Sequence, residues 1–468
     1  MKISDWIPSA SWRIAGMTYS EYMQIIADLH IHSRFSRACS RDLTLENIAT
    51  TCAAKGVNVV ATGDFTHPEW FKEMKEKLAE KEKGLYVLKS KIHPVIRRGA
   101  QSDDWANSKQ TRFLCSTEIS CIYSKGGKVR RLHIVVLAPS LEAVEKINLA
   151  LGKIGNLKSD GRPILGLDAK KLAEIVLGID EKCLIIPAHI WTPWFALFGS
   201  KSGFDSVEEC FEDLSDKIFA VETGLSSDPQ MNWRIKNLDQ VAIVSNSDAH
   251  SLHNIAREAN VFEIPAMPSP LDKGGNKRGL SYDEICRIIK EKNPQEFLST
   301  LEFYPEEGMY HFDGHRDCGV SFAPKESKRN KNICPKCKKP LTIGVLNRVE
   351  ELADPTRGED YHDKKRVPFK KLVELDKIIA AALNIKARGA KQVQQEYENL
   401  IKNFGTEFAV LLKADFDQLK QATLPKIAEG IKRVREGQVQ ITAGFDGQYG
   451  KIKIFSEQER NNYQKKLF

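Results

Sequence analysis

Histidine and acidic side chains follow most of the apolar runs in the first 250 residues. The run Val241-Ala-Ile-Val244 leads into Ser245-Asn-Ser-Asp-Ala-His250, and Ile25-Ile-Ala27 leads into Asp28-Leu-His-Ile-His32. Residues i and i+2 of an extended chain point to the same side, so the Asp and His of the first segment can reach one ion together, as can the two His of the second. A fold that brings both strand ends to one site is therefore required.

Short apolar runs alternate with amphipathic runs up to residue 250, which is typical of a parallel sheet with covering helices, open or closed into a barrel. The predicted strands are Ile25–Ile31, Val57–Thr62, Phe113–Ile119, Leu132–Ala138, Cys183–Ala188, Ile218–Glu222 and Val241–Asn246. The predicted helices are Thr44–Ala54, Leu141–Leu151, Asp168–Leu177 and Met231–Leu238.

The polar residues at the strand ends decide between an open sheet and a closed barrel. Ligands at the carboxyl ends of many strands converge on one point only if the strands form a ring, whereas an open sheet spreads them along an edge. We therefore predict an α/β fold with a barrel of about seven strands. The polar residues at these ends are His30, His32, Asp64, Glu118, His133, His189, Glu222, Asp248 and His250.

Clustering of this kind favours a metal centre, although a lone buried histidine is usually an ordinary core residue. Five of the eleven histidines fall at the predicted strand ends. A mixed histidine and carboxylate set suits two or three divalent ions (Zn, Mn, Mg or Fe), with Glu118 and Asp64 able to bridge them. The predicted ligands are His30, His32, Asp64, Glu118, His133, His189, Asp248 and His250.

Such a cluster lowers the pKa of bound water and neutralises charge on a phosphoryl group during in-line attack. The sequence contains no Gly-x-Ser-x-Gly elbow, P-loop or Gly-x-Gly-x-x-Gly fingerprint that would indicate another chemistry. No side-chain nucleophile is needed. We assign the catalytic roles to Asp248, Glu118 and His189.

A second metal site is predicted near residue 325. His315-Arg-Asp-Cys318 and Cys334-Pro-Lys-Cys337 are separated by fifteen residues, the spacing of a zinc ribbon in which His replaces the first Cys. His311 is a less well-spaced substitute for His315. Because four ligands leave no open position, this zinc should fold the module rather than catalyse. Its ligands would be His315, Cys318, Cys334 and Cys337.

Composition limits the class of protein. A chain of 468 residues with 41% hydrophobic content can form two or three globular domains. The apolar runs are far short of a membrane span, and Met1–Gly16 lacks the order of a signal peptide, so we expect a cytoplasmic protein that binds no membrane. Single cysteines beside apolar residues should be reduced; they are Cys39, Cys52, Cys115, Cys121, Cys183 and Cys210.

The formal charge of +8 is concentrated near the C-terminus. Phe369–Phe468 contains 18 Lys and Arg against 12 Asp and Glu, so this region carries +6. The skew fits a region that faces a polyanion, and a solvated helical surface rich in lysine explains it equally well. Helices are predicted at Phe369–Leu383, Ala390–Phe404 and Leu424–Glu436, with a hairpin from Gln438–Thr442 and Lys451–Phe455.

The segment Phe71–Arg112 interrupts the alternation of strands and helices. Lys72–Gly84 is charge-dense and is predicted to be one exposed helix, and Val95–Trp105 a loop. A long insertion on the C-terminal face of a barrel commonly shapes substrate access. A surface excursion without function is the other interpretation.

The ligand segments resemble the motifs of the PHP (polymerase and histidinol phosphatase) superfamily: Asp28-Leu-His-Ile-His32, Thr62-Gly-Asp64, Glu118, His133, Pro187-Ala-His189 and Ser247-Asp-Ala-His250. The superfamily implies a distorted seven-stranded barrel with a trinuclear metal centre that hydrolyses phosphoesters. Many members carry a further ligand just after the first His pair, where this chain has Ser33–Cys39. Asp64 stands where a His is common, and His67 is a nearby alternative.

The wider match, through Val221–Trp233 and the region after residue 310, resembles the endonuclease Q family, whose members are often labelled UvrD-like helicases although no helicase motif occurs here. The resemblance implies a DNA repair endonuclease that uses a metal-activated hydroxide to cut 5′ to deaminated bases (uracil, hypoxanthine, xanthine) or abasic sites. It implies three parts: a barrel over 1–305, a zinc ribbon over 306–350 and a basic helical domain over 351–468.

Two other functions fit the same residues. One is a PHP phosphoesterase with a different substrate, either a general nuclease or a small-molecule phosphatase, against which the ribbon and the basic tail argue. The other is a binding protein whose cluster has lost activity. The expected partner is DNA, as a duplex or single strand with a damaged base; the sequence specifies no replication or repair partner.

Overall fold

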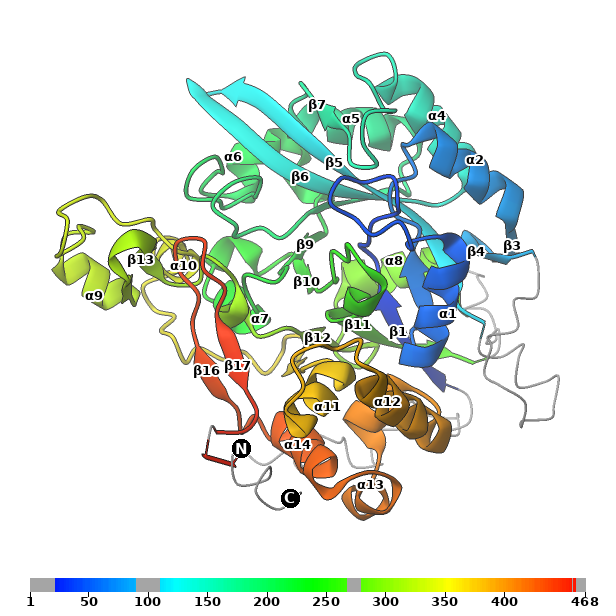
Figure 1. The fold of residues 1–468 in the computed structure, drawn as a ribbon. Coiled ribbons are helices and arrows are strands. Elements are labelled where there is room, and N and C mark those ends of the chain that lie inside the picture. Colours follow the sequence, from blue (N-terminus) through cyan, green and yellow to red (C-terminus); the bar gives the residue numbers. More distant parts are fainter. Residues whose placement is uncertain (1–21, 90–109, 267–278, 457, 460–468) are drawn as a thin grey trace.

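A large mixed sheet forms the centre of the computed structural model, which describes residues 22–89, 110–266, 279–456 and 458–459 (Figure 1). Its eleven strands are β1 (Tyr22–Asp28), β2 (Val59–Ala61), β3 (Leu78–Glu82), β4 (Leu85–Leu88), β5 (Arg112–Lys125), β6 (Lys128–Ala138), β7 (Ile164–Leu165), β8 (Leu184–Pro187), β11 (Ala259–Pro265), β12 (Phe297–Glu302) and β15 (Phe369–Lys371). The main path is β15-β12-β11-β1-β2-β5-β4-β3; β6 and β7 pair with β5, and β8 with β6.

The sheet is mixed rather than wholly parallel. β1, β2 and β5 are parallel neighbours, whereas β5 with β6, β6 with β8 and β1 with β11 are antiparallel. The alternation of apolar and amphipathic runs in the sequence did not predict the long hairpin of β5 and β6. Its turn is Gly126-Gly127, and both glycines have positive φ, as a two-residue hairpin turn requires.

A separate parallel pair, β9 (Ala220–Glu222) and β10 (Ala242–Val244), lies between β8 and β1. The backbone N–H of Ile190, after β8, donates to the carbonyl of Glu222 at 3.1 Å. On the other side the N–H of Asp248, after β10, donates to the carbonyl of His30 at 2.9 Å. These bonds draw the carboxyl ends of β1, β8, β9 and β10 together.

Helices connect the strands. They are α1 (Leu45–Lys55), α2 (Pro68–Lys77), α4 (Leu141–Leu151), α5 (Ala169–Ile179), α6 (Val207–Phe211), α7 (Pro229–Trp233) and α8 (Tyr282–Glu291). The side chains of Thr44, Ser140 and Asp168 accept hydrogen bonds at the N-termini of α1, α4 and α5, where the sequence predicts these helices to begin. The predicted helix Met231–Leu238 is instead α7 followed by a 3₁₀ turn, Lys236–Leu238.

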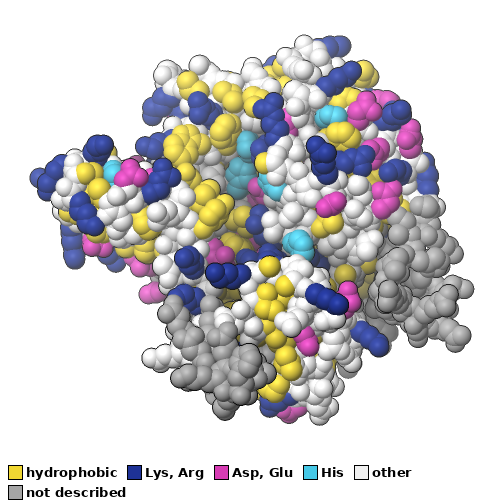
Figure 2. Space-filling model, viewed as in Figure 1, with side chains coloured by type: hydrophobic (Ala, Val, Ile, Leu, Met, Phe, Trp, Pro, Cys, Tyr) yellow, Lys and Arg dark blue, Asp and Glu magenta, His cyan; other side chains and the backbone are white. Residues whose placement is uncertain are grey.

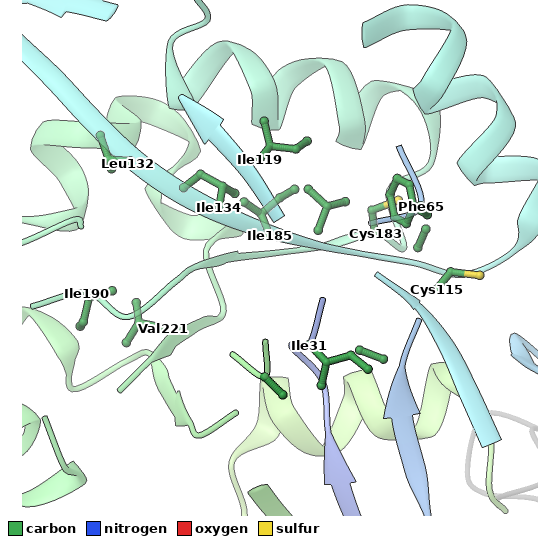
Figure 3. Close-up of a cluster of buried hydrophobic side chains, with 14 of the residues drawn as sticks. Ile31, Phe65, Cys115, Ile119, Leu132, Ile134, Cys183, Ile185, Ile190 and Val221 are labelled. Carbon is green, nitrogen blue, oxygen red and sulfur yellow. The ribbon is translucent and has the colours of Figure 1, made fainter. Parts of the chain in front are cut away.

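The main core lies between the sheet and these helices. Figure 3 shows side chains from β5, β6 and β8, among them Ile119, Ile134 and Ile185, gathered with Ile31 and Phe65. All five side chains are buried. Removing this much apolar surface from water stabilises the strands that carry the histidine and acidic side chains at their ends.

The prediction of one helix over Lys72–Gly84 is wrong beyond Lys77. Helix α2 ends there, and the chain continues as the antiparallel strands β3 and β4, of which β4 pairs with β5. Leu78, Leu85 and Leu88 are buried on the sheet, and this burial outweighs the helical pattern of the charged residues. The predicted loop Val95–Trp105 lies outside the described residues.

Residues after 310 add a small module and a helical region. The small module contains β13 (Asp313–His315), β14 (Val320–Phe322), α9 (Pro324–Arg329) and α10 (Val345–Leu352). The helical region contains α11 (Leu375–Leu383), α12 (Lys391–Phe404), α13 (Phe416–Ala422) and α14 (Pro425–Arg435), and the hairpin β16 (Gln440–Thr442) and β17 (Lys451–Lys453). The predicted helix Phe369–Leu383 begins with β15, which joins β12 of the large sheet.

Helices α11–α14 enclose a hydrophobic core of their own, which includes Ile378, Leu400, Leu419 and Ile431. In Figure 1 these helices lie below the large sheet, and the small module projects to the left. Within the described residues, no helix is both long and apolar enough to cross a membrane.

Candidate metal centre

His30 and His32 leave the end of β1 side by side, and a carboxylate orients each ring. His30 Nδ1 lies 3.0 Å from Glu222 Oε1, and His32 Nδ1 lies 2.9 Å from Asp64 Oδ1. A carboxylate beside Nδ1 favours the tautomer that carries its proton there, which leaves Nε2 with a free lone pair. Both Nε2 atoms therefore present a lone pair to the centre of the site, as metal-binding imidazoles do.

Glu118 occupies the middle of the site. Its Oε2 lies 3.3 Å from His32 Nε2 and 3.8 Å from His30 Nε2. Its other oxygen, Oε1, lies 2.8 Å from His133 Nδ1 and 3.1 Å from His189 Nε2. The carboxylate thus faces one pair of imidazoles with each oxygen.

Two groups of candidate ligands share this residue. The first comprises His30, His32, Glu118 and Asp248, and the second comprises Glu118, His133 and His189; within each group the ligand atoms lie within 4.8 Å of one another. Three atoms of the first group are buried and make no hydrogen bond to the described residues: His30 Nε2, His32 Nε2 and Asp248 Oδ1. Buried polar atoms without partners are costly, so this donor set fits divalent cations.

The backbone is strained where it presents these side chains. Asp64, His189 and Asp248 have φ values of 48°, 31° and 46°, a region that non-glycine residues seldom adopt. At Gly224, which follows β9, an added Cβ would lie 2.3 Å from the Cβ of His189. Strain of this kind persists where the surrounding structure enforces it, and it is common at functional sites.

Burial and charge set the ionisation of the cluster. Burial raises the pKa of Glu118, but the charges of His133 and Arg162 and the hydrogen bonds with His133 and His189 outweigh it and hold that pKa well below its usual value. Burial lowers the pKa of His133 to about 4, although Glu118 acts in the opposite direction. An anionic carboxylate beside a neutral imidazole is the state in which both bind metal.

Two predicted ligands occupy other places. Asp64 Oδ1 faces His32, and its Oδ2 accepts hydrogen bonds from the N–H and Oγ of Ser33, both at 2.7 Å, and from Ser36 Oγ at 2.9 Å. Asp64 therefore supports His32 from behind. His250 Nδ1 lies 2.8 Å from the carbonyl of Asp248, and its ring centre is 4.7 Å from that of His32, at the rim of the site.

Two further residues belong to the site. Glu222 was noted only as a strand end, but its carboxylate also accepts hydrogen bonds from the N–H of His189 and from Asn246 Nδ2, both at 2.9 Å. Arg162, whose Nη1 donates to Glu118 Oε2 at 3.1 Å, was missed. It comes from a loop between α4 and β7 with no motif or strand end to mark it.

The second predicted metal site is also assembled. His315, Cys318, Cys334 and Cys337 come together, with their ligand atoms within 4.8 Å of one another, and His315 Nε2 lies 3.6 Å from Cys337 Sγ. The alternative residue, His311, is not part of this group. Gly319 and Lys338, which follow the two pairs, have φ values of 60° and 63°, so each pair ends in a tight turn. The donor set fits Zn²⁺.

Figure 2 shows a hollow in the middle of one face of the molecule, with histidine side chains in its wall. Hydrophobic and basic side chains surround the hollow, and the small module stands at its left. Among the candidate ligands, His30, His32 and Glu118 are buried, whereas Asp248 and His250 are 21% and 30% exposed, so the site opens to solvent on the side of these two residues.

Comparison with known proteins identifies relatives over nearly the whole chain. The "Uncharacterized protein YqxK" of Bacillus subtilis is 28% identical over 442 residues, which cover 92% of this chain and 99% of the relative. The "Uncharacterized protein MJ0043" of Methanocaldococcus jannaschii is 35% identical over 266 residues, or 56% of this chain, so the match spans about a third (31%) of its length. Residues 374–438 match the family model of the MJ0043 C-terminal domain.

Two solved structures are similar to the fold. The lesion-specific endonuclease PfuEndoQ from Pyrococcus furiosus has a TM-score of 0.75 and 27% identity, covering 94% of this chain and 99% of that chain. A complex of Endonuclease Q with a 27-mer duplex that carries an abasic lesion at the active site also has a TM-score of 0.75, with 28% identity over 94% of this chain and 98% of that one.

Proposed function

Since this chain belongs to the endonuclease Q family, we propose that it is a DNA repair endonuclease that cuts the phosphodiester 5′ to a deaminated base or an abasic site. As a member of this family the chain is a metal-dependent nuclease. The observation that carries the proposal is the pair of ligand groups that share Glu118, with Asp248 of the first group partly exposed to solvent.

Two or three divalent ions would be held by His30, His32, Glu118, His133, His189 and Asp248, with Asp64 and His250 beside them. Bound there, divalent ions lower the pKa of water and neutralise charge on a phosphoryl group. Glu222 and Asp64 orient the imidazoles of His30 and His32. In the hydrolysis, water oxygen bonds to phosphorus and the bond from phosphorus to the 3′-oxygen breaks. A 3′-hydroxyl and a 5′-phosphate result.

The rest of the chain would hold the duplex. We propose a structural zinc at His315, Cys318, Cys334 and Cys337, and DNA contacts from this ribbon and the basic C-terminal region. Reading a damaged base requires extruding it from the stack, which costs less for a mispaired base. We propose domain boundaries at 1–305, 306–350 and 351–468, supported by the separate core of α11–α14.

We also propose that seven strands close into a distorted barrel: β1, β2, β5, β6, β8, β9 and β10. The hydrogen bond from Ile190 to Glu222 would join β8 to β9, and the bonds between residues 30–32 and 248–249 would join β10 to β1. A closed ring explains why residues from distant strands meet at one mouth.

The test uses matched duplexes with and without a single deoxyuridine, deoxyinosine or abasic site, incubated with the protein and Mn²⁺. We expect one nick, on the 5′ side of the lesion, in the damaged duplexes alone. Cutting of both duplexes would indicate a general nuclease. Hydrolysis of small phosphomonoesters without DNA cutting would indicate a phosphatase, and DNA binding without any cutting would indicate an inactive binding protein.

The matched variant is Asp248→Asn, which keeps the size of the side chain and removes its charge. Asp248 Oδ1 lies 3.0 Å from His32 Nε2, so the variant should lose ions from the first ligand group. We expect cleavage to disappear while affinity for the damaged duplex, measured by fluorescence anisotropy, changes by less than about threefold because the DNA contacts lie mainly on other parts of the surface. A parallel loss of DNA affinity would mean that Asp248 is structural.

A further inference from the structure

Arg162 lies beside the metal centre, where its charge helps to keep Glu118 ionised, but the proposed function gives it no contact with the substrate. It belongs to the loop between α4 and β7, and its Nη1 donates to Glu118 Oε2 at 3.1 Å. Glu118 is fully buried, whereas the Arg162 side chain is 25% exposed. The guanidinium therefore extends from the carboxylate that both ligand groups share to the open side of the site.

The loop that carries Arg162 is firmly held. Asp160 Oδ1 accepts hydrogen bonds from the backbone N–H of Arg37 at 3.1 Å and of Arg162 at 3.2 Å. The N–H of Gly161 donates to the carbonyl of Phe35 at 3.0 Å. An added Cβ at Gly161 would lie 2.4 Å from Asp64 Oδ2 and from Ser36 Oγ, so only glycine fits there. The guanidinium is thus positioned by the same contacts that position Asp64 behind His32.

When cations occupy the site, the charge of Arg162 favours the binding of an anion beside it. Glu118 Oε2 lies 3.3 Å from His32 Nε2 and 3.8 Å from His30 Nε2, so it would be a ligand of the first group. A guanidinium keeps its charge at any physiological pH. Glu118 lies between the guanidinium and the cation site, but one carboxylate does not offset the charge of a guanidinium together with divalent cations. A substrate phosphate supplies further negative charge, and the planar fork of arginine matches two of its oxygens.

We propose that Arg162 is a catalytic residue that binds the non-bridging oxygens of the scissile phosphate. This inference deepens the proposed function and rests on it for the identity of the substrate. One N–H group of the guanidinium stays on Glu118, and the others donate to the phosphate. Donors that are fixed in advance where negative charge increases stabilise the transition state more than the ground state.

The first test needs no catalysis. Protein loaded with Mn²⁺ and freed of excess metal is titrated with inorganic phosphate by calorimetry, as wild type, Arg162→Gln, Arg162→Lys and the control Arg41→Gln. Arg41 is an exposed arginine of the same charge, outside the set of residues that hold Asp160, Arg162 and Glu118. We expect Arg162→Gln to weaken phosphate binding about tenfold or more, Arg162→Lys less, and Arg41→Gln not at all.

The second test is kinetic and includes elemental analysis of each variant. We expect Arg162→Gln to lower kcat on a lesion duplex about 10²- to 10³-fold, with ion content unchanged. Replacing a non-bridging oxygen of the scissile phosphate by sulfur should slow cleavage. The factor should be larger for the wild-type protein than for the Arg162→Gln variant. Phosphate affinity equal to the wild type would overturn the proposal, and so would loss of ions from Arg162→Gln, since Arg162 would then only support Glu118. If the wild type cuts no lesion duplex but phosphate binding depends on Arg162, the proposed function fails and this inference stands.

Discussion

Single side chains determine which atom of each imidazole faces the ions. Asp64 and Glu222 hold the Nδ1 sides of His32 and His30, and both carboxylates are fully buried. A carboxylate behind a ligating histidine fixes its tautomer and raises its basicity. Asp64 was predicted to be a ligand because it stands at a strand end. In the structure its first oxygen faces His32 Nδ1 and donors from Ser33 and Ser36 occupy its second oxygen, so we propose that it supports His32.

Asp64→Asn should weaken ion binding without removing a ligand. The amide cannot accept from His32 Nδ1 as strongly as a carboxylate does, so His32 loses its preferred tautomer. We expect affinity for Mn²⁺, measured by competition with a chelator, to fall about 10- to 100-fold, while thermal stability of the metal-free protein changes little. Asp42→Asn, at an exposed loop, is the control. Unchanged affinity in Asp64→Asn would contradict the supporting role.

Two neighbouring strands each have a buried acidic residue at one end. Glu258 directly precedes β11, Glu302 is the last residue of β12, and both side chains are fully buried. Burial raises the pKa of Glu302 to about 7, although hydrogen bonds from Ser245 and Thr300 act in the opposite direction. Burial and the neighbouring Glu302 raise the pKa of Glu258 well above its usual value. Both carboxyls therefore hold protons in the folded protein at mildly acidic pH.

This pair makes stability depend on pH. Between the unfolded pKa of about 4.5 and the folded pKa of about 7, the folded chain holds a proton on Glu302 that the unfolded chain has released. Stability should be highest at the acidic end of this window and fall as pH rises through it, by about 1.4 kcal/mol for each unit between the two pKa values. Glu302→Gln cannot ionise, so its urea-unfolding free energy should fall less between pH 5 and pH 7.5.

The exposed residue Glu181 provides the matched control, because Glu181→Gln removes a carboxylate that faces solvent. Its pH dependence should follow the wild type. A Glu302→Gln protein whose stability falls with pH as steeply as the wild type would show that Glu302 is already ionised in the folded state at pH 5.

Secondary structure was predictable where local signals decide it. The capped helices α1, α4 and α5 and the strand ends at His30, His189 and Asp248 follow from residues close in sequence. The hairpin of β3 and β4 was not predictable, because its residues form strands through burial against β5 and not through a strand pattern in their charged sequence. Glu118 and His133 lie within long strands, not at their ends, since the hairpin β5–β6 extends past both.

At the scale of the whole molecule, the site is assembled from residues that are far apart in the sequence. Glu118 meets His30, His32, His133, His189 and Asp248, which lie in or directly after β1, β6, β8 and β10. The sequence predicted this meeting from the chemistry of the strand ends. It did not predict that Arg162 belongs to the site, because a loop residue reaches Glu118 only through tertiary contacts such as the hydrogen bond of Gly161 with Phe35.

Anomalous scattering from crystals of the protein grown with Mn²⁺ and Zn²⁺ tests the shared ligand groups most directly. We expect one peak among His30, His32, Asp248 and Glu118, a second among Glu118, His133 and His189, and a third at His315, Cys318, Cys334 and Cys337. Glu118→Gln should lose or weaken the first two peaks and retain the third. A crystal of active protein with a peak at the cysteines alone would contradict the account.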